Sequence, residues 1–365
     1  MDKDKEKKEK RKLFDVIRIL IRHLAALFVV SSLLAGCAAV PADSKVVFTT
    51  GFGEEEVFRI EDSVCSLTET LVYLVNTQKG YEESFGSGIW EVDTDSGTVR
   101  ERLKDSVLAK VAQIKAMNLL AVENGIELDD NEKNKVEQAA EEYYSSLSQA
   151  DIAAMNGLTK EELVNIYAEQ AVADKLYEYI IRDINPEISD DEARTITVEQ
   201  IFLKTYSLDA QGEKAPYDGD KKAEVYRTAR SILNQLDEGT SFEELMAQYN
   251  EAEDSTISFG KGKMESAYET AAFNLGTEEV SDVVETGDGY VIIKCISTFN
   301  REETEANKVK IVAQRKREVF GQQYDAFVAT LTKELNQKLW DSVDLVSDEN
   351  VSAGGFMEVY NKYFK

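Results

Sequence analysis

Histidine is almost absent from this chain of 365 residues, which contains one, His23. That residue lies in an N-terminal segment that we expect to be removed, for reasons given below. A mature chain without histidine cannot form the usual serine or cysteine catalytic triad, because these triads use an imidazole as the general base. It also lacks the imidazole ligand of most catalytic zinc sites. We therefore expect neither a metal nor another cofactor.

Cysteine and proline are also scarce, with three residues of each. Cys37 follows an apolar leader-like segment, whereas Cys65 and Cys295 fall in different expected domains. The chain contains no Cys-x-x-Cys pair, so thiol–disulfide catalysis is not expected. Cys295, on an apolar strand, is interpreted as a small buried residue.

Basic residues are outnumbered over most of the chain. The first 36 residues hold nine basic and five acidic side chains, so the formal charge of −27 leaves −31 for the remainder. An acidic body repels phosphate backbones, which argues against nucleic acid as a partner. A solvated surface that keeps an exported protein soluble is the simpler interpretation, and attraction of basic unfolded chains is the alternative. A hydrophobic content of 43% is enough for two folded units.

The first 36 residues have the pattern of a secretory signal peptide, with a basic region followed by a short apolar run. The run begins at Leu24 and is too short for an ordinary membrane-spanning helix. It ends in Leu34-Ala35-Gly36-Cys37, which resembles a bacterial lipobox and implies that Cys37 is acylated. An uncleaved anchor with an incidental cysteine is the alternative. Residues 37–56 are then a tether on the outer face of the cytoplasmic membrane.

Residues 57–190 are expected to form one strand and then a helical region. The strand is Val57–Ile60. Apolar residues three and four apart predict helices over about 98–124, after Asp129-Asp130, and from the capping box at Thr159 to a point before Pro186. These apolar stripes are interpreted as core and not as a ligand groove.

A glycine turn, a short helix, a hairpin and a final apolar strand are predicted next to one another. The turn begins at Phe259, and the helix runs from Met264 to Leu275. Gly287-Asp288-Gly289 closes the hairpin onto the strand Tyr290–Ile296. These elements carry, in order, the patterns F-x-x-G-x-M, A-A-F-x-L, E-V-S and G-Y-x-I-I-K.

This series of patterns resembles the parvulin (PpiC, or rotamase) family of peptidyl-prolyl cis/trans isomerases, over roughly Thr195–Thr298. The resemblance implies an α+β domain at residues 195–299, with a four-stranded antiparallel sheet and surrounding helices. It also implies a shallow apolar pocket for proline, which suits such a pocket because it has no backbone N–H. The amide before proline crosses a barrier of about 18–20 kcal/mol without any bond being broken.

The resemblance also implies roles for individual residues. The residues that match or border the proline pocket are Met264, Tyr268, Phe259, Phe273 and Phe202. The family's two histidines match Gln200 and Val291, and its pocket cysteine or aspartate matches Ala252. The polar half of the site is therefore different, and the candidates for polarising the amide are Gln200, Glu251 and Asp288.

The pattern after Asn300 predicts a long helix. Apolar residues recur every three or four positions: Val309, Val312, Phe320, Tyr324, Phe327, Leu331 and Leu335. Such a stripe must cover an apolar surface, so residues 300–345 are predicted to pack on the N-terminal helices. A coiled-coil homodimer is the alternative. The aromatic tail, residues 346–365, either docks on the same helices or forms a client surface.

A helical region on both sides of a parvulin domain resembles the chaperone module of PrsA- and SurA-like foldases. The sequence thus predicts a lipid-anchored extracytoplasmic foldase, whose partners are unfolded secreted proteins with X-Pro bonds. A non-catalytic holdase with a degenerate parvulin domain is the second hypothesis. A surface lipoprotein for an unidentified extracellular ligand is the third.

Overall fold

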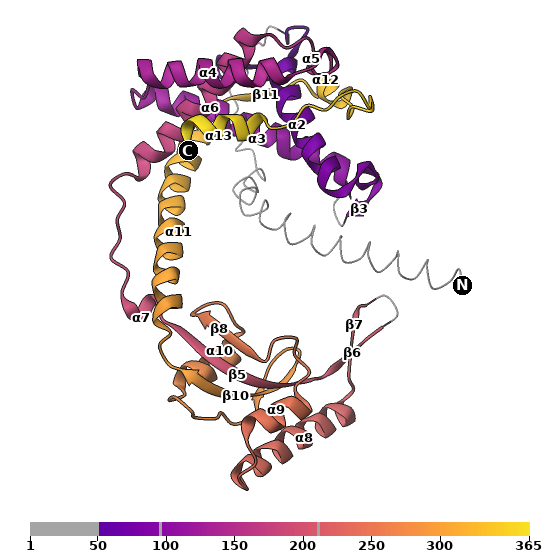
Figure 1. Ribbon diagram of the computed structural model, residues 1–365, viewed down its shortest axis with the longest axis vertical. Coiled ribbons are helices and arrows are strands. Elements are labelled where there is room, and N and C mark those ends of the chain that lie inside the picture. The colour runs from indigo at the N-terminus through magenta and orange to yellow at the C-terminus, as the bar shows by residue number, and fades with distance from the viewer. Residues whose placement is uncertain (1–50, 95–96, 210–211) are drawn as a thin grey trace, which may run out of the picture. The chain divides into compact units, whose positions relative to one another are not determined.

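The computed structural model of the protein describes residues 51–94, 97–209 and 212–365 (Figure 1). The expected signal peptide, Cys37 and most of the expected tether lie outside these residues. The described chain divides into two compact units. The first contains the described residues up to Asp183 together with Val319–Lys365, and the second is Ile184–Glu318. Within the described ranges, no helix is both long enough and apolar enough to cross a bilayer.

The first unit contains a three-stranded antiparallel sheet in the order β11-β1-β2. The strands are β1 (Glu56–Ile60), β2 (Ser63–Ser66) and β11 (Lys333–Leu335). Phe58 of β1 lies opposite Cys65 on one side and Leu335 on the other. The two chain segments of this unit are therefore joined by backbone hydrogen bonds, although the second unit separates them in the sequence.

Helices form most of the first unit. They are α2 (Leu67–Phe85), α3 (Val99–Glu123), α4 (Asp130–Ser146), α5 (Gln149–Ala154), α6 (Lys160–Ile181), α12 (Gln337–Asp341) and α13 (Phe356–Phe364). The 3-10 helix η2 (Ser87–Glu91) and the strand pair β3 (Asp93–Thr94) and β4 (Gly97–Thr98) connect α2 to α3. Capping boxes at Thr98, Asp129 and Thr159 start α3, α4 and α6, because each side chain bonds an otherwise unpaired helical N–H. The predicted starts are confirmed.

The aromatic tail is part of the core of the first unit. Phe356 stacks on Tyr167 with ring centroids 4.7 Å apart, and Tyr167 donates its hydroxyl hydrogen to the Phe356 carbonyl at 2.6 Å. Tyr360 and Trp340 are also buried. Buried aromatic side chains contribute large apolar areas. The tail therefore stabilises helices such as α6 that lie far from it in the sequence. Docking of the tail, one of the two expectations, is confirmed.

Helix α11 (Arg301–Val328) is shorter than the sequence predicted. Phe320 and Tyr324 are buried in the first unit, but Val309 is 70% exposed. Leu335, the last member of the predicted stripe, belongs instead to strand β11. The prediction of one continuous helical stripe is wrong, because the last residue of the pattern, Leu335, pairs with β1 and the first, Val309, faces solvent.

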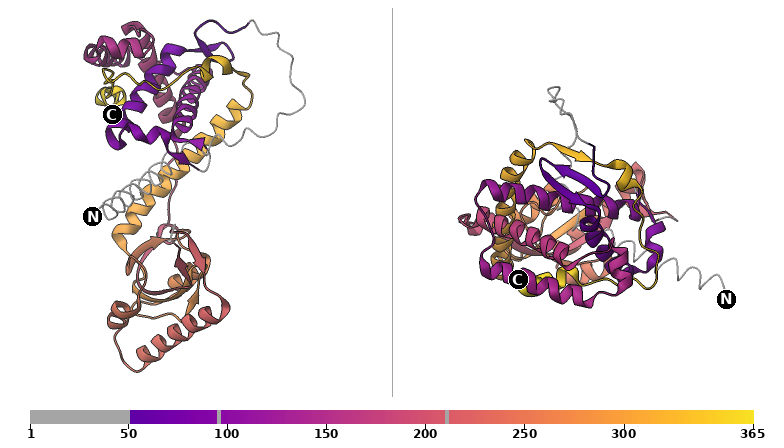
Figure 2. Two further views of the ribbon diagram at one scale, coloured as in Figure 1. Left: turned by 90° about the vertical axis from the view of Figure 1, so that its right-hand side faces the viewer. Right: turned by 90° about the horizontal axis from the view of Figure 1, so that it is seen from above.

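The second unit is built on a four-stranded antiparallel sheet in the order β8-β5-β10-β9. The strands are β5 (Thr195–Lys204), β8 (Thr256–Gly260), β9 (Val284–Glu285) and β10 (Gly289–Ser297). The unit also contains α7 (Asp190–Ala193), α8 (Gly219–Asp237), α9 (Phe242–Tyr249) and α10 (Ser266–Asn274). Figure 2 (left) shows the curvature of this sheet. The expected α+β fold is confirmed.

Alternation along the strands gives the second unit two apolar layers. On one face, Ile201, Leu203 and Ile292 pack with residues of α8 and α9. On the other face, Ile196, Val198, Val291 and Ile293 pack with residues of α10. Figure 1 shows α8 and α9 on one side of β5 and β10 and α10 on the other. The second layer contains the residues that the sequence assigned to a proline pocket.

Two parts of the second unit were not predicted. Strand β8 pairs with β5 over Thr256–Gly260, where the sequence indicated a turn beginning at Phe259. The strands β6 (Tyr206–Leu208) and β7 (Lys214–Pro216) form a hairpin where a polar loop was expected. Strands β6 and β7 are short and largely exposed, and β8 has only two alternating apolar side chains, Ile257 and Phe259, so none of the three has a long enough pattern to identify a strand in a sequence.

Candidate functional site

The apolar layer beneath α10 brings five expected site residues together. Phe259 and Tyr268 are buried in the cluster, and Phe202, Met264 and Phe273 are partly buried against it. The Phe259 ring meets the rings of Tyr268 and Phe273 edge-on, with centroids 5.7 and 5.8 Å away. The two buried rings thus support the three side chains that keep accessible surface.

Met264 lies in a loop that two carboxylates hold in place. It precedes α10, so the prediction that the helix begins at Met264 is wrong. The Glu269 Oε2 atom accepts hydrogen bonds from the N–H groups of Gly262, at 2.6 Å, and Lys263, at 3.2 Å. Gly262 has a φ of 77°, which permits this turn at little cost. Glu265 accepts a hydrogen bond from Gly287 N at 2.9 Å and thereby links the loop to the β9–β10 turn.

Gln200 is hydrogen-bonded to buried Tyr268 of the same cluster. The Tyr268 hydroxyl donates to the Gln200 Oε1 atom at 3.1 Å, and Gln200 Nε2 donates to the Asp254 carbonyl at 2.8 Å. Burial raises the pKa of the Tyr268 phenol, which therefore remains a neutral donor. The pair gives the site a fixed polar edge that does not change its charge near neutral pH.

Glu251 and Asp288 lie at the other end of β5. Glu251 Oε2 accepts a hydrogen bond from Lys204 N at 2.6 Å, and Glu251 N donates to the Phe202 carbonyl at 2.9 Å. Asp288 forms an ion pair with Lys214 of the hairpin. Both carboxylates are exposed. No described hydrogen bond joins either of them to Gln200 or Tyr268, so the three polar candidates do not form one network.

The two other family positions are apolar here. Val291 is 1% exposed and lies opposite Phe202 in the sheet. Ala252 donates its N–H to Asn250 Oδ1 at 3.2 Å, and the same oxygen accepts from Phe202 N at 2.9 Å. Asn250, which the sequence did not single out, therefore ties the loop after α9 to β5. The sequence feature that could have identified Asn250 is its position directly after the helix Phe242–Tyr249.

Gly289 allows β10 to approach β5 beside the site. A Cβ at this position would lie 2.1 Å from the Leu203 carbonyl oxygen and 3.1 Å from Cε2 of Phe202. Any side chain would therefore separate the strands and displace the Phe202 ring. The glycine that was predicted as part of a hairpin turn also shapes the wall of the apolar site.

Comparison with known families agrees with this geometry. Residues 207–297 match the rotamase family, described as a PPIC-type PPIASE domain. The chain thus contains a parvulin-type domain, and the resemblance noted in its sequence is confirmed.

The chain is also similar to PrsA foldases. It is 34% identical over 97 residues to foldase protein PrsA of Geobacillus kaustophilus, and 35% identical over 96 residues to that of Halalkalibacterium halodurans. Each alignment covers 25% of this chain, and 34% and 29% of the respective relative, so the chain spans about a third of their length. A crystal structure of peptidylprolyl isomerase (PrsA) from Bacillus cereus aligns with a TM-score of 0.36 and 21% identity, covering 75% of this chain and 98% of that one.

Proposed function

We propose that the protein is a membrane-anchored extracytoplasmic foldase that isomerises X-Pro peptide bonds and chaperones unfolded secreted proteins. The observation that carries the proposal is the apolar cluster in which Met264, Phe202 and Phe273 remain accessible over buried Phe259 and Tyr268. It lies in the domain with the rotamase match. An accessible apolar surface of this kind suits a proline ring.

Isomerisation of an X-Pro bond does not require an ionisable catalytic group. Isomerisation breaks no covalent bond, and its barrier arises from the partial double bond of the planar amide. A twisted amide loses this resonance and is less polar, so an apolar surface that excludes water favours it over the planar form. Gln200, Glu251 and Asp288 would then orient or polarise the amide carbonyl and nitrogen. A site without histidine is compatible with this mechanism.

The anchor and the clients belong to the same proposal. Acylation of Cys37 is supported by the Leu-Ala-Gly-Cys pattern, and two or more acyl chains would hold the protein firmly at the outer face of the membrane. Unfolded proteins as clients are supported by the foldase names of the relatives, and the proposed anchor on the outer face of the membrane would make these clients secreted proteins. The acidic chain would attract basic segments of such clients.

A holdase without turnover is the second candidate. It is favoured by buried Val291 at one histidine position, since this residue has no polar atom to offer a substrate. The two functions differ in a proline-limited refolding assay, because uncatalysed isomerisation takes tens of seconds or longer. We expect micromolar protein to accelerate the slow phase. An unchanged slow phase together with suppressed client aggregation would replace the foldase by the holdase.

A further inference from the structure

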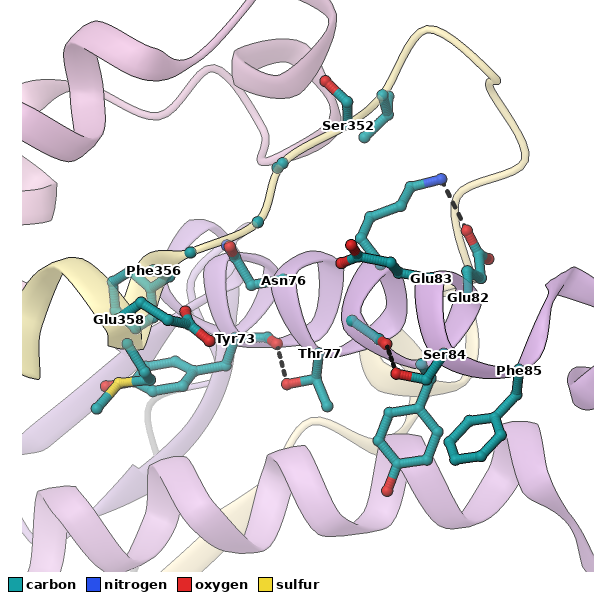
Figure 3. Close-up of a pocket in the computed structure, with 18 residues that line it drawn as sticks. Tyr73, Asn76, Thr77, Glu82, Glu83, Ser84, Phe85, Ser352, Phe356 and Glu358 are labelled. Carbon is teal, nitrogen blue, oxygen red and sulfur yellow. Dashed lines mark hydrogen bonds and ion pairs between the residues drawn. The ribbon is translucent and has the colours of Figure 1, made fainter. Parts of the chain in front are cut away.

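The first unit contains a groove that the rotamase site does not explain. It has a volume of about 1040 Å³ and lies between α2, over residues 73–85, and residues 351–358 (Figure 3). We call it the α2 groove. Figure 3 shows Tyr73, Phe356 and Glu358 toward one end, and Glu83, Ser84 and Phe85 toward the other. Each end thus combines an aromatic ring with a carboxylate.

The middle of the α2 groove is open because small residues line it. Gly80 is exposed, and a Cβ added to it would meet no atom within 4 Å. The opposite wall contains Gly354 and Gly355, which are also exposed. Exposed glycine in the middle of a helix costs stability relative to other residues. Its presence here leaves space along α2 that any larger side chain would fill.

The polar groups of the α2 wall are bonded within the unit. Asn76 Oδ1 accepts from Tyr143 at 2.8 Å and Asn76 Nδ2 donates to the Val72 carbonyl at 2.8 Å. The Thr77 hydroxyl donates to the Tyr73 carbonyl at 2.7 Å. Because these groups already have partners, the wall favours an apolar occupant over one that needs specific hydrogen bonds.

The charges at the two ends are not neutralised. Lys79 pairs with Glu82 at 2.9 Å, so its charge is compensated. Glu83 and Glu358 are exposed and form no ion pair with any other described residue. A basic side chain at either end of an occupant would therefore complement the α2 groove, whereas an acidic one would be repelled.

The length of the α2 groove sets the length of its occupant. Tyr73 and Phe85 are twelve residues apart on a helix that rises 1.5 Å per residue, or about 18 Å. An extended chain covers this distance with about six residues. We propose that the α2 groove binds an extended segment of about six residues from an unfolded client, apolar in its middle and basic at its ends, with no requirement for proline. This inference rests on the chaperone part of the proposed function.

The test is fluorescence anisotropy with the full-length protein and two labelled hexapeptides without proline. One has the sequence Lys-Leu-Phe-Val-Leu-Lys, and the other has Glu in place of both Lys residues. We expect the basic peptide to bind at least tenfold more tightly. Gly80→Leu should weaken this binding at least tenfold without loss of helix, because leucine favours a helix more than glycine does. Ser145→Leu, at an exposed site of α4 that does not line the α2 groove, is the matched control and should bind normally.

The carboxylates are tested separately. The double variant with Glu83→Lys and Glu358→Lys should prefer the acidic peptide. Equal binding of both peptides to the wild-type protein, or unchanged binding by Gly80→Leu, overturns the inference. A Gly80→Leu variant that changes the sedimentation mass but not peptide binding also overturns it, since a second copy then occupies the α2 groove. If the wild-type protein binds the basic peptide but shows no isomerase activity, the proposed isomerase function is wrong and the inference about the α2 groove stands.

Discussion

The Tyr268 hydroxyl donates to the side-chain oxygen of Gln200 across 3.1 Å, joining α10 to the central strand of the second unit. The resemblance in the sequence predicts that Gln200 replaces a histidine of the parvulin family, and in the structure Gln200 accepts the hydrogen bond of the tyrosine in the apolar site. Burial keeps the phenol protonated by raising its pKa, and a glutamine amide does not titrate. The polar edge of this site is therefore the same at pH 6 and at pH 8.

The first prediction follows for the pH dependence of isomerisation. Between pH 6 and 8 we expect kcat/KM for an X-Pro peptide to stay constant, because neither Gln200 nor Tyr268 changes charge. A protease-free assay that follows the peptide directly over this range measures it. If kcat/KM instead changed with the titration of a single group with a midpoint near pH 6.5, the site would contain an ionising group. That result would contradict the assignment of Gln200 and Tyr268 as its polar edge.

Met264→Ala tests the apolar pocket. Loss of the accessible thioether surface should reduce kcat/KM about tenfold, corresponding to about 1.4 kcal/mol of lost contact in the transition state. Met246→Ala is the matched control, because Met246 is also partly buried but packs in the layer on the other face of the sheet. It should lower stability and leave kcat/KM within about twofold. Equal effects of both variants on activity would locate the site elsewhere.

Glu269→Ala tests the loop that carries Met264. The change removes the acceptor of the Gly262 and Lys263 N–H groups, which lie at 2.6 and 3.2 Å. We expect a several-fold higher KM at nearly unchanged kcat, together with a loss of about 1 kcal/mol of stability. Glu269→Gln keeps one oxygen acceptor and should restore most of the affinity. If Glu269→Ala loses stability without any change in KM, Glu269 has only a structural role.

The first unit should lose stability as the pH rises. Lys115 Nζ lies 2.9 Å from Glu69 Oε2 and 2.6 Å from Glu169 Oε1, so two carboxylates share one buried ammonium group. Desolvation raises the pKa of Glu69 to about 7. The folded state thus holds this proton more tightly than the unfolded state, and its contribution is fully present below about pH 4.5 and lost as the pH passes about 7.

This pH dependence can be measured by urea unfolding between pH 5 and 8. Trp90 and Trp340 are the two tryptophans of the chain and both are buried in the first unit, so tryptophan fluorescence follows that unit. We expect the free energy of unfolding to fall by roughly 2–3 kcal/mol over this range, and Glu69→Gln to remove most of the slope. The same slope in both proteins would show that another group is responsible.

The sequence predicted the parts of the fold whose signals are local. The capping box at Thr159 identified the start of α6, and apolar residues three and four apart identified α3. The five apolar site residues predicted from the family resemblance lie in one cluster. These signals lie within a few residues of each other, so a single sequence is enough to read them.

The features that were missed depend on contacts between distant residues. Strand β11 exists because Leu335 pairs with Phe58, and no local pattern distinguishes it from the end of a helix. Glu269 and Asn250 act through backbone groups, whose partners a sequence does not reveal. The α2 groove joins residues 73–85 to residues 351–358, so its open middle is visible in three dimensions alone.

The most direct test of the central claim is NMR exchange spectroscopy on a short peptide with one X-Pro bond, with and without the purified protein. We predict that the protein accelerates exchange between the cis and trans signals by orders of magnitude over the uncatalysed rate, leaves their populations unchanged, and loses most of this effect with Met264→Ala. Exchange at the rate of the free peptide, in the presence of folded protein, would contradict it.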